Sequence, residues 1–361
     1  MEKYQNTTKI LQKKEPKTIK FLDSYCDNKS FNNYSFAAFK SINDIYYLIY
    51  SNIINSMIIY DIINNKKINE IKTTDNSKII YFKYFSDIKN KREFMLTISI
   101  LTDNLSKSLK IWNVINFDCI YNFKNINNLY SACILNDNNN ELKIIMNCSK
   151  ENLHIYDFKG NKIKDLNIEN KSTISIELFY DKELNKNYII YGDDIIDNIT
   201  SYDYNENKIY HKYDNYDDSI DNLIIDKEKN KVILMYVTKY GNITLWDFHR
   251  GKLLKSVSIC YKDNFVKCIC FWNYKYSFLG FNRTYQYNPK RHYYFHNTDN
   301  INNSIRIINL DKKEMLTNFI SITNGMPKTL KKINHPKKGG YLISQDESGE
   351  IAIFDIAKME T

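Results

Sequence analysis

A short segment recurs seven times along the chain and limits the folds that the chain can adopt. Each copy alternates apolar and other residues, continues with a large side chain and closes with Asp or Asn, as in Leu109-Lys-Ile-Trp-Asn113. Alternation at a period of two is typical of a half-buried β-strand. The large residue and the closing residue of each copy are Tyr60 and Asp61, Trp112 and Asn113, Tyr156 and Asp157, Tyr202 and Asp203, Trp246 and Asp247, Ile308 and Asn309, and Phe354 and Asp355.

The spacing of the seven copies indicates one repeating architecture. The closing residues lie 44 to 62 residues apart, and further apolar runs bounded by Asn, Asp, Lys and Gly occur between them. Strands in every unit at a period of about 40–45 residues are typical of WD40 blades. From about Ser35 to its end the chain resembles a WD40-repeat protein, with Trp246-Asp247 as a literal Trp-Asp pair. The resemblance implies an all-β, seven-bladed β-propeller that serves as a platform for other macromolecules.

A helical fold is the alternative for segments so rich in Ile, Lys and Asn. The apolar runs are five to eight residues long, contain many β-branched and aromatic residues, and are interrupted by turn residues. These are features of strands rather than of helices.

The repeat also predicts the bounds of the blades. The expected blades span residues 35–72, 79–124, 129–167, 173–213, 220–258, 266–320 and 328–357. The last blade contains three strands only, and an unpaired sheet edge is unfavourable. We therefore expect Thr18–Asp23 to be its fourth strand, a closure that WD40 propellers commonly use. Residues 1–17 are expected to form a mobile basic arm, and residues 18–361 a single propeller domain.

Composition indicates the cellular compartment of the protein more clearly than it indicates a binding partner. The net charge of +9 comes mainly from Lys, and either follows from a composition rich in Asn, Lys, Ile and Tyr or indicates an acidic partner. The seven cysteines are odd in number and scattered, and no apolar signal segment begins the chain. No apolar run reaches the roughly 18 residues of a membrane-spanning helix. We expect an intracellular protein with reduced thiols, cytoplasmic first and nuclear as the alternative.

The most distinctive stretch is an insertion in the sixth blade, residues 283–303. Segments 284–287 and 292–295 flank Asn288-Pro-Lys-Arg291, which favours a turn, so we expect a projecting hairpin. Aromatic residues alternate with basic ones, a composition that suits a protein interface or stacking on single-stranded nucleic acid. A surface loop without a partner is the other interpretation. The candidate contact residues are Arg283, Tyr285, Tyr287, Lys290, Arg291, Tyr293 and Tyr294.

Acidic residues in the fourth blade form the second candidate. The loops after its second and fourth strands are expected on the same face as the insertion, and they contain Asp193, Asp194, Asp217 and Asp218. These loops lack the spacing and the glycine of an EF-hand, so we expect no calcium site. The acids form either a solvated patch or a contact for a Lys-rich partner.

In regular WD40 repeats, as the family implies, a His, a Ser or Thr, an Asp and the Trp form a hydrogen-bonded set within each blade. The last blade comes nearest, with Ser344, Asp346 and Phe354, and the others retain less. We therefore expect the blades to depend on apolar packing. Cys268 and Cys270 lie two residues apart and are expected on one side of a buried strand rather than at a zinc site.

The search for catalytic motifs is negative. The chain contains no GxSxG, HExxH, P-loop or GxGxxG motif. Membrane-binding propellers carry an Arg-Arg pair in their phosphoinositide motif, and this chain has none. We expect a non-catalytic protein-interaction scaffold without cofactor, metal or small-molecule substrate, and a subunit of a larger complex. A propeller that binds phosphoinositide or RNA is the alternative.

Overall fold

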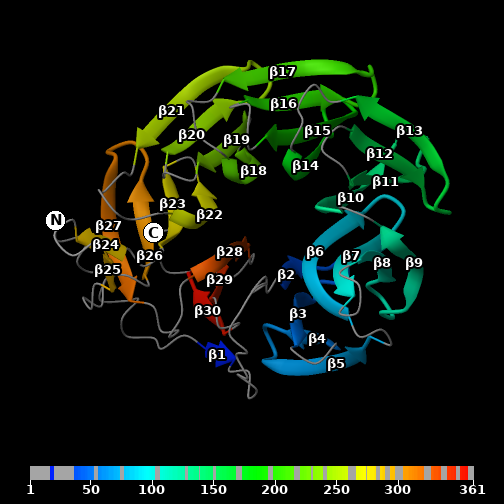
Figure 1. Ribbon diagram of the computed structural model, residues 1–361, viewed down its shortest axis with the longest axis horizontal. Coiled ribbons are helices and arrows are strands. Elements are labelled where there is room, and N and C mark those ends of the chain that lie inside the picture. The colour runs from blue at the N-terminus through cyan, green and yellow to red at the C-terminus, as the bar shows by residue number, and fades with distance from the viewer. Residues whose placement is uncertain are drawn as a thin grey trace. The chain divides into compact units, whose positions relative to one another are not determined.

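The computed structural model is built from β-strands throughout the residues that it describes. These are residues 17–19, 36–52, 56–73, 77–101, 106–126, 129–137, 139–148, 152–167, 173–193, 198–214, 220–228, 231–238, 242–258, 266–273, 275–281, 285–288, 293–296, 304–320, 327–334, 340–346 and 350–356. The strands form seven four-stranded sheets and one two-stranded sheet (Figure 1). The chain therefore has the fold of a seven-bladed β-propeller, as the repeat predicts.

Blades 1 to 4 lie in one compact unit, residues 33–223. Each blade is an antiparallel sheet whose strands pair in sequence order. Blade 1 contains β2 (Phe36–Lys40), β3 (Tyr46–Asn52), β4 (Ser56–Asp61) and β5 (Lys66–Lys72). Blade 2 contains β6 (Ser77–Asp87), β7 (Arg92–Leu101), β8 (Lys107–Asn113) and β9 (Cys119–Ile126). Blade 3 contains β10 (Ser131–Asn136), β11 (Leu142–Asn147), β12 (Asn152–Asp157) and β13 (Lys162–Asn167). Blade 4 contains β14 (Thr173–Asp181), β15 (Lys186–Asp193), β16 (Asn198–Asp203) and β17 (Lys208–Asp214).

The second compact unit comprises residues 1–32 and 224–361. Blade 5 contains β18 (Ile220–Glu228), which begins just before this unit, β19 (Lys231–Thr238), β20 (Asn242–Asp247) and β21 (Lys252–Ser258). Blade 6 contains β22 (Val266–Asn273), β23 (Tyr276–Phe281), β26 (Ser304–Asn309) and β27 (Glu314–Ile320). Blade 7 contains β28 (Pro327–Ile333), β29 (Tyr341–Asp346), β30 (Ile351–Asp355) and β1 (Lys17–Ile19).

The strand β1 confirms that the N-terminal segment completes blade 7. Its register places Thr18 opposite Ala352 and Ile19 opposite Ile351 of β30. The described strand is shorter than expected and starts one residue earlier, and residues 20–23 of the predicted Thr18–Asp23 strand lie outside the described part. The predicted arm, residues 1–17, also lies outside it except for Lys17.

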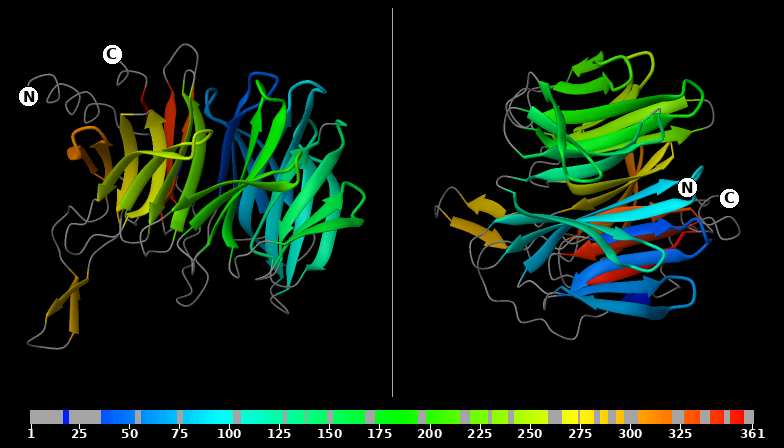
Figure 2. Two further views of the ribbon diagram at one scale, coloured as in Figure 1. Left: turned by 90° about the horizontal axis from the view of Figure 1, so that it is seen from above. Right: turned by 90° about the vertical axis from the view of Figure 1, so that its right-hand side faces the viewer.

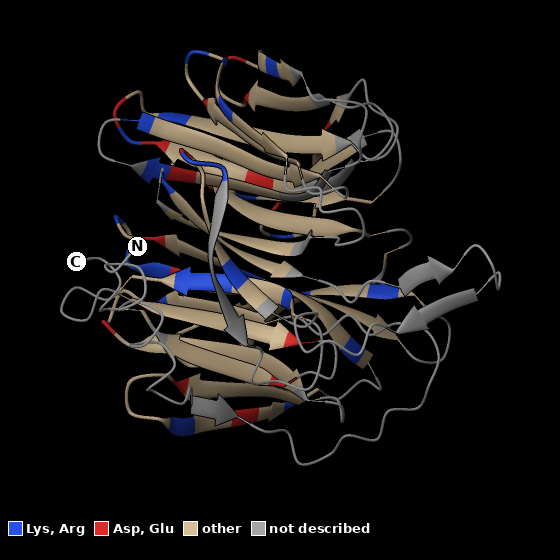
Figure 3. Cartoon of the chain, turned by 90° about the vertical axis from the view of Figure 1, so that its left-hand side faces the viewer, with Lys and Arg blue, Asp and Glu red and all other residues tan. Residues whose placement is uncertain are grey.

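The position of a strand within its blade determines its burial. First strands of neighbouring blades contact one another, as β2 and β6 do. Second strands such as β7 are buried along most of their length, while the fourth strand β5 is mostly exposed. The fourth strands carry many lysines, which disfavour pairing with another chain. Figure 3 shows charged residues mainly near strand ends and turns, with much of each strand uncharged.

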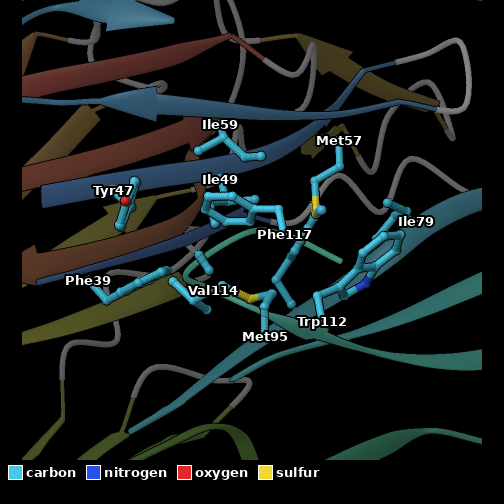
Figure 4. Close-up of a cluster of buried hydrophobic side chains, with 12 residues drawn as sticks. Phe39, Tyr47, Ile49, Met57, Ile59, Ile79, Met95, Trp112, Val114 and Phe117 are labelled. Atoms are coloured by element: carbon cyan, nitrogen blue, oxygen red, sulfur yellow. The ribbon is translucent and has the colours of Figure 1, made fainter. Parts of the chain in front are cut away.

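Apolar side chains from neighbouring blades fill the space between the sheets. Between blades 1 and 2, Ile49 and Met57 pack with Met95 and Trp112 in one buried cluster (Figure 4). Phe39 also stacks on Tyr84, with 3.7 Å between the ring centroids. Burial of this kind supplies the main stabilisation of the fold.

Candidate interaction surface

The insertion of blade 6 forms a hairpin separate from the blade. Strands β24 (Tyr285–Asn288) and β25 (Tyr293–His296) pair with each other in an antiparallel two-stranded sheet. The predicted hairpin is therefore confirmed. The register puts positions 285 and 287 on the same face of this sheet as positions 294 and 296. Figure 2 shows the two strands of the hairpin side by side.

The candidate contact residues are placed only in part. Tyr285, Tyr287, Tyr293 and Tyr294 belong to the hairpin strands, and Asp193 is the last residue of β15. The other candidates lie outside the described residues: Arg283, Lys290, Arg291, Asp194, Asp217 and Asp218. The hairpin and Asp193 belong to different units. A joint surface of the insertion and the acidic loops therefore stays a prediction.

The closing residues of the repeat have a structural role that the sequence did not reveal. Asp61 Oδ1 accepts hydrogen bonds from the amides of Ile63 (2.9 Å) and Asn64 (3.0 Å). Asn309 Oδ1 accepts them in the same way from Asp311 (2.9 Å) and Lys312 (3.1 Å). Equivalent bonds are made by Asn113, Asp157, Asp203 and Asp247. Each of these residues stabilises the turn between the third and fourth strands of its blade.

The same turns end in a left-handed residue, and a β-bulge follows in the fourth strand. Asn65, Asn207 and Lys313 have φ of 53°, 56° and 56°, and glycines occupy this place at Gly160 and Gly251. Three residues after this position, the pairing of the third and fourth strands skips one residue of the fourth strand in blades 1 to 6. Left-handed residues are common at the ends of short hairpin turns, and a bulge increases the local twist of a strand. The repeat therefore defines a turn as well as a strand.

The large residues of the repeat lie in the blade cores or at their edges. Trp112 is buried and its Nε1 donates a hydrogen bond to Thr97 Oγ1 at 2.9 Å. Blade 2 thus keeps a buried Trp–Thr bond that our expectation of apolar packing did not include. Ile308 and Phe354 belong to apolar clusters, whereas the Tyr60 hydroxyl bonds to Asn65 Oδ1 at 2.5 Å. Tyr156, Tyr202 and Trp246 are half-buried.

A charged pair joins two blades that are not neighbours in sequence. Lys83 Nζ of β6 lies 2.5 Å from Glu177 Oε1 of β14, with side chains 24% and 28% exposed. Burial acts to lower the pKa of Lys83, but the negative charge of Glu177 outweighs it and raises this pKa above its ordinary value. Nearby, the Tyr81 hydroxyl donates to the carbonyl of Ala132 at 3.4 Å. The pair therefore links blades 2 and 4 past blade 3.

A second carboxylate joins blades 1 and 2. Glu93, 3% exposed, accepts hydrogen bonds at Oε1 from the Tyr84 hydroxyl (2.5 Å) and the Ile42 amide (2.9 Å). Burial and this carboxylate raise the pKa of Tyr84. The sequence did not predict the bonds of Glu93 to Tyr84 and to Ile42. Tyr84 lies in a different strand from Glu93, and Ile42 is 51 residues away in the chain.

None of the described cysteines forms a disulfide. Cys268 and Cys270 are both buried in one apolar cluster, as their spacing predicts. Burial raises the pKa of Cys133 and of Cys270 to about 12, which keeps both thiols protonated and unreactive at neutral pH. Among the described residues, no three His, Cys, Asp or Glu side chains are grouped to hold a metal ion. That part of the chain also has no helix of the length and apolar character needed to cross a bilayer.

The chain matches no protein-family model, and no curated protein is significantly similar to it. The seven-bladed fold therefore rests on the strands and their pairing alone.

Proposed function

We propose that the chain is a divergent WD40-type propeller that acts as an intracellular, non-catalytic protein-interaction scaffold and as a subunit of a larger complex. One observation carries this proposal: the blade 6 insertion forms a sheet of its own instead of extending its blade. A hairpin of this kind presents side chains on both of its faces. It is also rich in tyrosine, a residue type enriched where proteins bind one another.

The base of the hairpin supports a role in display. The strands β23 and β26, which flank the insertion in sequence, pair with each other as far as Gly280 and Ile305. The strand that leads into the insertion and the strand that follows it therefore belong to one four-stranded sheet. A fixed base reduces the entropy that a partner must remove on binding.

The proposal of a non-catalytic role follows from sequence and chemistry together. Burial raises the pKa of the Cys133 thiol to about 12 and that of the Cys148 thiol to about 11, so neither thiol is activated as a nucleophile. The sequence also contains no nucleophile or metal-binding motif. We therefore expect no cofactor.

Affinity purification from the native cells tests the proposal. One variant replaces residues 284–295 by a short Gly-Ser linker, and a second changes Tyr285, Tyr287, Tyr293 and Tyr294 to Ser. The control changes Tyr130 and Tyr180, which are 46% and 47% exposed outside the hairpin. We expect both hairpin variants to fold and to lose a co-purifying protein that the control retains. Unchanged co-purification would remove the hairpin from the proposed function.

The alternative, a hairpin that binds RNA or phosphoinositide, predicts a different response. Binding driven by phosphate weakens steeply as salt concentration rises. A gel-shift assay with single-stranded RNA across a salt series, on the wild type and the four-tyrosine variant, separates this alternative from protein binding.

A further inference from the structure

Neither outer edge of the blade 6 hairpin is paired within the part of the chain that the structure describes. The strands β24 and β25 pair with each other, and no third described strand joins them. Their only extensive contacts with described strands are likewise with each other. A two-stranded sheet is at best marginally stable in water, whereas three or more strands form a more stable sheet. The hairpin is therefore stabilised when another strand joins one of its edges.

The hairpin lacks the charges that the outer edges of the blades carry. The outermost strands of the seven blades are β5, β9, β13, β17, β21, β27 and β1, and each contains at least one Lys or Glu. Charged side chains on an edge strand oppose its pairing with another chain. The strands β24 (Tyr-Gln-Tyr-Asn) and β25 (Tyr-Tyr-Phe-His) contain no Lys, Arg, Asp or Glu. The sequence thus opposes pairing at the edges of the blades but not at those of the hairpin.

The edge of β25 is complementary to the same edge of a second copy. When two identical strands pair antiparallel about a twofold axis, each supplies the amides and carbonyls that the other lacks. Pairing centred on Tyr294 places Tyr293 opposite position 295 of the second copy, a phenylalanine. Pairing centred on Phe295 places Tyr294 opposite position 296, a histidine. Aromatic pairs across strands stabilise a sheet and like charges destabilise it, so both registers are favourable.

We infer that the chain forms a homodimer in which β25 pairs antiparallel with β25 of a second copy. The two hairpins then make one four-stranded sheet. The turns between β24 and β25, which contain Lys290 and Arg291, lie at opposite ends of this sheet and do not repel each other. The paired edge is four residues long and buries less than the about 1,200 Å² of a standard interface, so the dimer is weak and concentration-dependent. This inference uses the main-chain edge of the hairpin, whereas the proposed function uses side chains on its faces, so neither rests on the other.

Sedimentation equilibrium of the full chain over a concentration series tests the inference. We expect the wild type to shift from monomer to dimer as its concentration rises. The variant Tyr294→Lys/Phe295→Lys removes aromatic pairs and places like charges opposite each other in either register. It should raise the dissociation constant of the dimer about tenfold. Replacement of residues 284–295 by a Gly-Ser linker should leave a monomer at every concentration.

The matched control places the same two charges on the other strand of the hairpin. Gln286 and Tyr287 lie opposite Phe295 and Tyr294, so Gln286→Lys/Tyr287→Lys changes β24 alone and should dimerise as the wild type does. Three results would overturn the inference: a wild type that stays monomeric at all concentrations, a linker variant that still dimerises, or equal dimerisation of the two lysine variants. A monomeric wild type whose hairpin variants lose a co-purifying protein would leave the proposed function intact. Unchanged circular dichroism confirms that each variant is folded.

Discussion

Blades 1 to 4 and blades 6 and 7 share one repeat and apolar packing between blades, but they differ in the polar contacts added to this packing. In the first unit, polar contacts cross between blades: Arg92 Nη2 to the Asn140 carbonyl (3.3 Å), Asn187 Nδ2 to the Asn136 carbonyl (2.9 Å), and Lys83 to Glu177. Between blades 6 and 7, buried apolar side chains such as Trp272, Leu330 and Leu342 pack together, and the polar links include those from Lys332 Nζ to the Trp272 carbonyl (3.1 Å) and from Cys268 Sγ to the Pro327 carbonyl (3.6 Å).

Close packing is most evident at Gly280 in blade 6. A Cβ atom at this position would lie 2.9 Å from Pro327 Cβ of blade 7 and closer still to Cys268 Sγ. The comparison indicates that the repeat determines the strands of each blade. The residues between blades can contact one another through hydrogen bonds and ion pairs or through apolar packing. Directional polar bonds fix one alignment, whereas apolar packing depends on volume.

The largest effect is expected for an apolar residue between blades 6 and 7. Leu342→Ala removes a side chain that is 1% exposed and should cost about 2–5 kcal/mol of unfolding free energy through lost burial and a cavity. Urea unfolding measures it. Leu253→Ala, at a site 37% exposed in the same unit, is the control and should cost less than about 1 kcal/mol. Equal costs would show that packing at this interface is not what stabilises the unit.

The charged link between blades 2 and 4 is expected to show the next largest effect. Glu177→Ala leaves Lys83 without its carboxylate and should cost about 2–4 kcal/mol, below the cost for a dry pair because both side chains are partly exposed. Lys83→Met/Glu177→Leu should recover most of this loss. A double-mutant cycle measured by urea unfolding gives the coupling.

The same pair has a defined pH dependence. The pKa of Lys83 is raised, so its contribution is complete below the ordinary lysine value and is lost as pH rises above it through the folded-state pKa. The coupling should therefore be constant between neutral pH and about pH 9. A coupling free energy near zero at neutral pH would show that the Lys83–Glu177 pair does not stabilise the contact between blades 2 and 4.

The smallest effect is expected for the turn chemistry that both units share. Asp61→Ala in blade 1 and Asn309→Ala in blade 6 each remove the acceptor of two amide bonds, at a cost of about 1–2 kcal/mol. Asp61→Asn should cost less than about 0.5 kcal/mol, because Asn309 already performs this role. Thermal unfolding compares the three. A large loss for Asp61→Asn would mean that charge, rather than an acceptor oxygen, is required there.

Strand positions were predictable because they depend on local patterns. Alternation in segments such as residues 242–247, the repeat spacing and the turn residues predict seven strand-rich units, and the structure has seven four-stranded sheets. The pairing of the N-terminal segment with blade 7 followed from counting strands.

Other features depend on distance in space, which a single sequence does not reveal. Lys83 and Glu177 are 94 residues apart, and no periodicity links them. Glu93 is the second residue of the mostly apolar strand β7, and nothing in that pattern predicts its bonds to another blade. The closing Asp or Asn was a visible signal, yet its role as a turn acceptor emerges only from the bonds to the next amides. Of the candidate site, the hairpin was predictable from its Asn-Pro turn, whereas the roles of its residues depend on a partner.

The pairing of the N-terminal strand with blade 7 is the central claim, and disulfide trapping tests it most directly. Thr18 and Ala352 are opposite each other, and Ser344 faces Ala352 from the other side, two strands from Thr18. Strands two apart lie roughly 10 Å from each other, beyond the about 7 Å that a disulfide spans. On mild oxidation, Thr18→Cys/Ala352→Cys should form a cross-link seen by peptide mass spectrometry, and Thr18→Cys/Ser344→Cys should not. No cross-link in the first variant, or equal cross-linking in both, would contradict the closure of the seventh blade.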